Sequence, residues 1–360
     1  MKQWLETRQV LDRLAELRRE GKKAALATVV RVRGSAYRRE GAKLLVAEDG
    51  TTTGNVSGGC LEEDVREVAL QVLRTGRPQL RHYCSGADEI YAWDLGVGCE
   101  GQVEVFVAPA SDAWTRERAL LQERAPFAVC TIVAEEREPG PEKRLIVTAT
   151  RCDGGLGSPE LDAATADRAR ELIGGAASGL HEIAGRLVFI DVFVPPPQLV
   201  VIGAGEDARP LARLALDMGF RVVVVDRRPG LLTPDRFPSG VRLVQSDATH
   251  VQQHLLLDER CYAVVMTHNF ADDKEYVRAL VRTPVSYIGM LGPRRRTERI
   301  LGALDAEGPL DTSRIYGPVG LDIGAEGAEQ VALSVVGEIL AVRSGRRGLS
   351  LRERKRPIHV

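Results

Sequence analysis

The segment Gln198-Leu-Val-Val-Ile-Gly-Ala-Gly-Glu-Asp-Ala208 decides the fold of the second half of this 360-residue chain. Its apolar run predicts a buried strand, its two glycines predict a tight turn, and residues 207–218 predict a helix. A second predicted strand, residues 221–226, ends in the acid Asp226. A strand, a glycine turn, a helix and a strand with a terminal acid are together typical of a dinucleotide-binding unit.

This unit makes Gly203, Gly205 and Asp226 candidate cofactor-binding residues. The glycines allow a pyrophosphate to approach the backbone at the helix N-terminus, and the acid can bind a ribose hydroxyl. However, the carboxylates of Glu206 and Asp207 stand at the same helix start and would repel a phosphate. The pattern predicts a Rossmann-like fold and leaves open whether NAD(P) or no nucleotide is bound.

Short apolar runs alternate with helical stretches throughout residues 195–345, which predicts a Rossmann-like, doubly wound parallel sheet. His268 directly follows one predicted strand. Because ligands of open α/β sheets lie at the carboxyl edge of the strands, we include this histidine among the candidate site residues. Residues 346–360 are predicted to form a charged tail.

Three consecutive arginines follow a glycine turn in the segment Tyr287-Ile-Gly-Met-Leu-Gly-Pro-Arg-Arg-Arg296. They fall in the first turn of a predicted helix, where cations are unfavourable for the helix dipole. An anionic ligand would compensate for this, so Arg294 and Arg295 are candidate cofactor-binding residues. The alternative is that these side chains simply extend into water.

Residues 1–194 are predicted to form an α+β domain with an internal duplication. With the Rossmann-like domain that follows, we predict the α/β class for the whole chain. The proposed repeats cover about residues 22–109 and 125–195. Four matches support them: Ala27-Thr-Val-Val with Cys130-Thr-Ile-Val, Lys43-Leu-Leu-Val with Arg144-Leu-Ile-Val, Glu48-Asp-Gly50 with Cys152-Asp-Gly154, and Val105-Phe-Val-Ala-Pro109 with Val192-Phe-Val-Pro-Pro196. An internal repeat of this kind predicts two copies of one structural unit.

The segment Gly54-Asn-Val-Ser-Gly-Gly-Cys60 carries the strongest chemical signal of the first half. Consecutive glycines at 58 and 59, beside Asn55, let amide groups converge on an anion, and a helix start activates a thiol. Cys60 is therefore a candidate metal and cofactor contact. In the second repeat the equivalent region reads Gly157-Ser-Pro-Glu, without a thiol. The alternatives are a small cysteine that fills a loop junction, and a cysteine hydrolase whose histidine partner the sequence does not identify.

Composition excludes several other classes of protein. The formal net charge of −1 gives no global attraction to nucleic acid or to an anionic membrane. No apolar run approaches the roughly 18 residues of a membrane span. The six cysteines contain no CxxC pair, which favours reduced thiols. We therefore expect a cytoplasmic protein.

Seven segments taken together resemble the XdhC/CoxI family, the accessory proteins of xanthine dehydrogenase and carbon monoxide dehydrogenase. The resemblance covers almost the whole chain, and the segments around Cys60 and at 320–325 are its most specific parts. The segments are Gly34-Ser35, Gly54-Asn-Val-Ser-Gly-Gly-Cys-Leu-Glu62, Cys99-Glu-Gly-Gln-Val-Glu104, Gly203-Ala-Gly205, Thr267-His268, Tyr287-Ile-Gly-Met-Leu-Gly-Pro-Arg-Arg-Arg296 and Gly317-Pro-Val-Gly-Leu-Asp-Ile-Gly-Ala325.

The resemblance implies a maturation factor rather than a catalyst. Members of the family bind the molybdenum cofactor (molybdopterin), protect it while a cysteine desulfurase sulfurates it, and deliver it to an apo molybdenum hydroxylase. By this resemblance Cys60 would contact molybdenum or pterin, with Cys99 as the second candidate. We expect a homo-oligomer, such as a homodimer. The rival hypothesis is an NAD(P)-dependent oxidoreductase with His268 as its acid or base.

The chain also differs from the family pattern at three places in the second domain. Glu206 replaces the histidine of a GAGH turn, His268-Asn-Phe replaces an HDH segment, and Pro293 replaces a serine. These differences leave the Cys60 segment intact.

Overall fold

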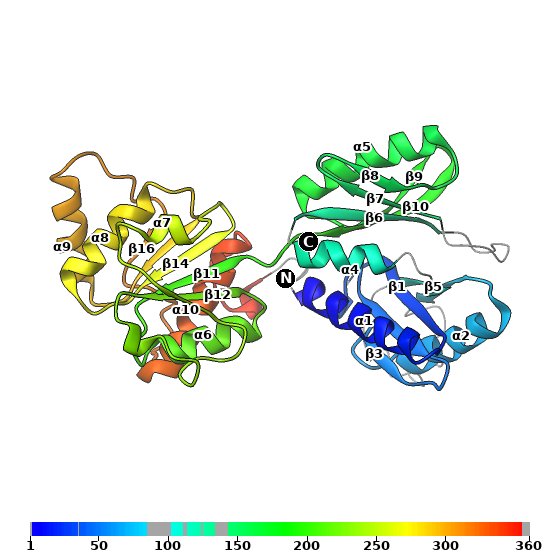
Figure 1. The fold of residues 1–360 in the computed structure, drawn as a ribbon, viewed down its shortest axis with the longest axis horizontal. Coiled ribbons are helices and arrows are strands. Elements are labelled where there is room, and N and C mark those ends of the chain that lie inside the picture. Colours follow the sequence, from blue (N-terminus) through cyan, green and yellow to red (C-terminus); the bar gives the residue numbers. More distant parts are fainter. Residues whose placement is uncertain are drawn as a thin grey trace. The chain divides into compact units, whose positions relative to one another are not determined.

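The computed structural model describes residues 2–34, 36–84, 102–110, 114–123, 125–133 and 143–354. The chain divides into two compact units, Lys2–Pro195 and Pro196–Glu353 (Figure 1). Across the described residues, no helix combines the length and the apolar character that crossing a lipid bilayer requires.

The first unit contains two five-stranded antiparallel sheets with the same strand order. Sheet A has the order β3-β2-β1-β5-β4, and sheet B has the order β8-β7-β6-β10-β9. The strands of sheet A are β1 (Ala24–Arg33), β2 (Lys43–Ala47), β3 (Thr52–Gly54), β4 (Gln79–Cys84) and β5 (Gln102–Pro109). Those of sheet B are β6 (Phe127–Ile132), β7 (Arg144–Thr148), β8 (Cys152–Gly154), β9 (Gly179–Ile183) and β10 (Arg186–Phe193). Their identical order shows that one unit of structure occurs twice.

Strand register identifies the equivalent residues of the two sheets. Lys43 of β2 pairs with Thr28, and Arg144 of β7 pairs with Thr131. This register confirms the predicted matches of Lys43-Leu-Leu-Val with Arg144-Leu-Ile-Val and of Ala27-Thr-Val-Val with Cys130-Thr-Ile-Val. The predicted match of Glu48-Asp-Gly50 with Cys152-Asp-Gly154 is wrong, because Cys152–Gly154 is strand β8 and corresponds to β3. An Asp-Gly pair makes a turn in the first segment and continues a strand in the second.

The predicted match of Val105–Pro109 with Val192–Pro196 is also wrong. Phe106 lies opposite Thr28 in sheet A, and Phe189 lies opposite Thr131 in sheet B, so these two phenylalanines are equivalent. The sequence comparison instead aligns Phe106 with Phe193. Both Phe189 and Phe193 stand in the apolar run of β10, so local similarity alone does not distinguish them.

Helices cover one face of each sheet, and the opposite faces share a core. Helix α2 (Glu62–Thr75) packs on sheet A, and α5 (Pro159–Gly175) packs on sheet B. Apolar side chains of both sheets then pack together with α1 (Lys2–Arg19) and α4 (Trp114–Glu123). The two copies are therefore joined by a common apolar interior.

The second unit is a six-stranded parallel sheet with the order β13-β12-β11-β14-β15-β16, which confirms the predicted Rossmann-like fold. Its strands are β11 (Gln198–Ile202), β12 (Arg221–Asp226), β13 (Arg242–Gln245), β14 (Cys261–Val265), β15 (Tyr287–Met290) and β16 (Ile315–Tyr316). Its helices are α6 (Ala208–Asp217), α7 (Val251–His254), α8 (Phe270–Val281), α9 (Arg294–Asp305) and α10 (Gly327–Arg343). Alternate residues of β11 face two separate cores, one under α6 and α10 and the other under α8 and α9. The strand order reverses between β11 and β14, where ligands of such sheets usually bind.

Candidate cofactor-binding site

The Cys60 loop, residues 55–61, connects β3 to α2. The sequence predicts a helix start at Cys60, whereas α2 begins at Glu62. The thiol therefore precedes the first helical turn. Gly59 has a φ of 118°, a backbone conformation that side-chain-bearing residues rarely adopt, so the loop path requires glycine at this position.

Glu62 and Ser57 occupy four amide groups at this loop. The Glu62 carboxylate accepts hydrogen bonds from the amides of Val56 at 3.2 Å and Ser57 at 2.8 Å. The Ser57 hydroxyl accepts from the amides of Gly59 at 3.0 Å and Leu61 at 3.1 Å. The same hydroxyl donates to the Glu62 carboxylate. Much of the amide cluster that the glycines predict is therefore used internally.

The Glu62 carboxyl gives the loop its own negative charge. Burial raises the pKa of this carboxyl, but hydrogen bonds from Ser57 and Val56 outweigh burial and hold the pKa below its usual value. The group is therefore ionised at neutral pH. A phosphate at the start of α2 would meet repulsion from it, so this loop suits a ligand other than a bare oxyanion.

Several groups of the Cys60 loop remain available. Among the described residues, the amides of Gly58 and Cys60 and the side chain of Asn55 have no hydrogen-bond partner. The Cys60 thiol is free and half-buried at the edge of the apolar core between α2 and sheet A. The ring of Tyr37, 71% exposed, lies so close to Gly58 that a Cβ there would stand 3.4 Å from the Tyr37 Cγ. The second predicted thiol, Cys99, lies outside the described residues.

The predicted glycine turn of the Rossmann-like unit closes tightly on a neighbouring strand. A Cβ at Gly203 would lie 2.5 Å from the carbonyl oxygen of Met266, so only glycine fits. The Asp226 carboxylate accepts a hydrogen bond from the Ala204 amide at 2.8 Å, and the Arg228 guanidinium donates to it at 2.8 and 2.9 Å. Burial raises the pKa of Asp226, but these hydrogen bonds lower it more, so its net pKa is depressed. The acid that would bind a ribose is therefore already engaged.

Polar side-chain contacts cross the carboxyl edge of the parallel sheet. His268 Nε2 lies 3.2 Å from a carboxylate oxygen of Asp207, which joins the segment after β14 to the segment after β11. His268 has a φ of 60°, uncommon for a residue with a side chain. Glu206 binds Arg209 at 2.7 Å and Arg236 at 2.8 Å. Glu206 and Asp207, the two acids expected to repel a phosphate, thus contact other side chains of the protein.

The three arginines at the start of α9 have different surroundings. Arg296 binds the buried carboxylate of Asp273 at 2.6 Å, and Asp273 also accepts hydrogen bonds from Thr267. Arg294 and Arg295 are exposed, and in the described part of the chain no carboxylate pairs with either of them. These two guanidinium groups are therefore available to an anion.

Sequence reasoning missed three contributors to these sites: Glu62, Asp207 as the partner of His268, and Asp273. A signal existed for the first of them, because acids are enriched in the first turn of helices and Glu62-Glu63-Asp64 follows the glycines directly. The other two depend on contacts between strand ends. No local pattern encodes these contacts.

Comparison with protein families identifies the class of protein that combines these two units. The XdhC and CoxI family model matches residues 17–84, which include the Cys60 loop, and the XdhC Rossmann domain model matches residues 199–339. Together with the relatives below, these matches show that the chain belongs to the XdhC and CoxI family.

Individual relatives match across most of their length. A protein of Bacillus subtilis described as a probable xanthine dehydrogenase component is 33% identical over 93% of this chain and 96% of its own. The molybdenum cofactor insertion chaperone PaoD of Escherichia coli is 24% identical over 93% of this chain and 88% of its own. The crystal structure of a xanthine dehydrogenase from Bacillus halodurans superposes with a TM-score of 0.77 at 28% identity, covering 95% of this chain and 98% of that one.

Proposed function

We propose that this chain is an accessory protein that binds the molybdenum cofactor as cargo and inserts it into a xanthine dehydrogenase-type molybdenum hydroxylase. The Cys60 loop carries the proposal: a half-buried free thiol stands among unused amide donors. Among the described residues, no histidine is hydrogen-bonded to this thiol, which weighs against a cysteine hydrolase. The similarity to PaoD and to the Bacillus subtilis relative supports this class of cargo and client.

The donor set fits a sulfur-rich molybdenum cofactor. Thiolates suit soft metal centres, so Cys60 would contact the metal, while Gly58, Gly59 and Asn55 would shape the loop around the pterin. The ionised Glu62 disfavours the cofactor phosphate at this point. Arg294 and Arg295 remain proposed cofactor contacts of the second unit by themselves, because exposed guanidinium groups bind phosphates well. Cys99 remains the second proposed sulfur contact.

The proposal extends to the partners of the reaction. A cofactor held by a thiol is shielded from solvent oxidants while a cysteine desulfurase delivers sulfur to it. The apo-hydroxylase would then receive the sulfurated cofactor. We expect these steps to take place in the cytoplasm on a homo-oligomer.

NAD(P) is the alternative cofactor, and the Rossmann-like unit is its expected site. Gly203, Gly205, Asp226 and His268 would be its contacts. The hydrogen bonds of Asp226 to Ala204 and Arg228 weigh against an NAD(P)-dependent oxidoreductase, because a ribose would have to displace them. We therefore place this function second.

The test compares two thiols of the same chain. Cys60 and Cys152 are both free, and Cys152 is exposed in the second copy. We expect Cys60→Ala, purified from a cofactor-producing host, to retain about tenfold less molybdopterin than wild type, which corresponds to about 1.4 kcal/mol of binding energy. Cys152→Ala should retain the wild-type amount. Fluorescence of the oxidised pterin measures both, and equal loading of Cys60→Ala and wild type would refute the role of the thiol.

A further inference from the structure

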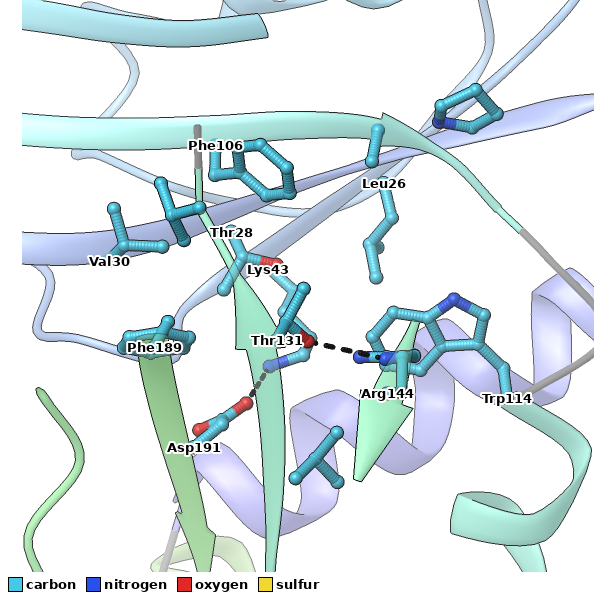
Figure 2. Close-up of a pocket in the computed structure, with 14 residues that line it drawn as sticks. Leu26, Thr28, Val30, Lys43, Phe106, Trp114, Thr131, Arg144, Phe189 and Asp191 are labelled. Carbon is cyan, nitrogen blue, oxygen red and sulfur yellow. Dashed lines mark hydrogen bonds and ion pairs between the residues drawn. The ribbon is translucent and has the colours of Figure 1, made fainter. Parts of the chain in front are cut away.

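A small cavity of about 20 Å³ lies where sheets A and B of the first unit face each other (Figure 2). Residues from equivalent strand positions line it in matched pairs, which include Lys43 with Arg144, Phe106 with Phe189, and Ala108 with Asp191. Equivalent positions of the two copies therefore meet at this cavity. A cavity of this size holds about one water molecule, so it is an interface rather than a ligand pocket.

One matched pair breaks the symmetry in charge. Asp191 stands opposite Val129 in sheet B, and the equivalent position of sheet A, opposite Leu26, holds Ala108. Sheet A therefore brings a cation to the interface without an acid. Sheet B brings both a cation and an acid.

The single acid pairs across the interface. Figure 2 shows the Lys43 ammonium of sheet A directed at the Asp191 carboxylate of sheet B, with which it forms an ion pair. The two side chains are only 2% and 6% exposed. Arg144, the counterpart of Lys43, instead lies 2.9 Å from Glu117 of α4 and stacks 3.4 Å from the centre of the Trp114 ring. In the described part of the chain, the two equivalent cations thus pair with carboxylates from different elements.

Two of the remaining matched pairs do not distinguish one sheet from the other. Thr28 and Thr131 are identical, as are Phe106 and Phe189, so packing at these positions alone would accept sheet A against a second sheet A. In that arrangement each Lys43 would face Ala108. A buried cation that loses its carboxylate is strongly destabilising, because no solvent replaces the partner.

We propose that the Lys43–Asp191 pair selects the pairing of sheet A with sheet B and rejects the pairing of sheet A with sheet A of a second copy. A duplicated domain needs such a device, because its two halves have the same strand order and similar inner faces. The ion pair makes the inner faces of the two sheets different in charge. It thereby favours packing of sheet A on sheet B of the same chain.

A cysteine introduced at Thr28, which lines the cavity, tests this proposal in the full-length chain. Thr28→Cys places a thiol opposite sheet B, whereas sheet A–sheet A pairing would bring two such thiols together. The protein is unfolded, refolded and mildly oxidised, and mass spectrometry of peptides counts the links between two residues 28. With the native pair present, we expect only background linking.

Removing the charges should remove the selection. In Lys43→Met/Asp191→Leu we expect links between residues 28 to rise about tenfold or more, since the penalty on the rejected pairing is gone. The charge-swapped Lys43→Asp/Asp191→Lys keeps one ion pair between the sheets and should stay at background. The proposal would be overturned if Lys43→Met/Asp191→Leu gave as few links as the native pair, or if the charge-swapped variant gave many.

A second variant, Ala108→Asp, tests the proposal if the Lys43→Met/Asp191→Leu protein does not fold. Ala108→Asp gives sheet A its own acid, so a sheet A–sheet A interface would contain two complete ion pairs. We expect the same rise in links as in the apolar variant. Background linking in a folded Ala108→Asp protein would contradict the proposed selection.

Discussion

The Cys60 loop of the first copy and residues 155–161 of the second copy are equivalent segments that each follow a short strand. Both follow a glycine, Gly54 or Gly154, at which a Cβ would stand 2.3 or 2.2 Å from a backbone carbonyl oxygen. Both also use an acid near the helix start to bind the same amide. Glu62 binds the Val56 amide, and Asp162 binds the Leu156 amide. The scaffold of the two loops is therefore shared.

The two loops differ in where the helix begins. In the second copy Ser158 accepts the Leu161 amide at 3.2 Å and Pro159 opens α5, a favourable start for a helix. In the first copy Gly58 and Gly59 replace these two residues, and α2 begins only at Glu62. Glycine is a poor helix former. The exchange of Ser-Pro for Gly-Gly thus keeps one turn unwound and leaves Cys60, at the position of Glu160, in an open loop.

Transplanting the second loop into the first should give the largest functional effect. Ser57→Gly/Gly58→Ser/Gly59→Pro reproduces residues 157–159 and should start α2 about three residues earlier. We expect little net change in stability, because the new cap offsets the hydrogen bonds lost with the Ser57 hydroxyl, while molybdopterin retention falls about tenfold, as for Cys60→Ala. Thermal unfolding and pterin fluorescence measure the two effects.

The reciprocal change is the control for that prediction. Glu160→Cys puts a thiol into the second copy without opening its helix start. This variant should not gain cofactor binding, because the loop still has the Ser158 cap. If it binds the cofactor, or if the transplanted first loop retains full loading, the open turn is not what distinguishes the copies.

Substitution of the shared glycine should affect both copies alike. Gly54→Ala and Gly154→Ala each force a Cβ against a carbonyl oxygen at a positive φ, so each should cost roughly 2–4 kcal/mol. Chemical denaturation measures the loss. Gly76→Ala is a matched control, since Gly76 also has a positive φ but a Cβ there meets nothing within 4 Å. A large loss in only one of the two copies would contradict a shared scaffold.

The sequence predicts much of this architecture because the signals are local. The apolar strand before Gly203 and the acid at Asp226 suffice for the Rossmann-like unit, and the likeness of β2 to β7 reveals the duplication. Contacts between distant residues are not predictable in this way. The pairing of Lys43 with Asp191 joins residues 148 positions apart.

The candidate site shows the same limit. Sequence indicates the thiol and the glycines of the Cys60 loop, since they are adjacent. It does not show that Glu62 turns back to fill the loop, because that depends on the path of the backbone through Gly59. Likewise, the pair of Asp207 with His268 forms only once β11 and β14 lie side by side.

The smallest expected effect is on the pH dependence of stability, and it tests the negative charge of Glu62 at the Cys60 loop. Because the pKa of Glu62 is lower in the folded protein than its ordinary value of 4.5, the carboxylate stabilises the fold above that value. This contribution is lost as the pH falls through the lower, folded-state pKa. Glu62→Gln should therefore be less stable than wild type at neutral pH, and the difference should shrink below about pH 4.5. Urea denaturation at several pH values measures it, with the exposed Glu63→Gln as control. A difference that stays constant with pH would mean that Glu62 holds the Cys60 loop by shape and not by charge.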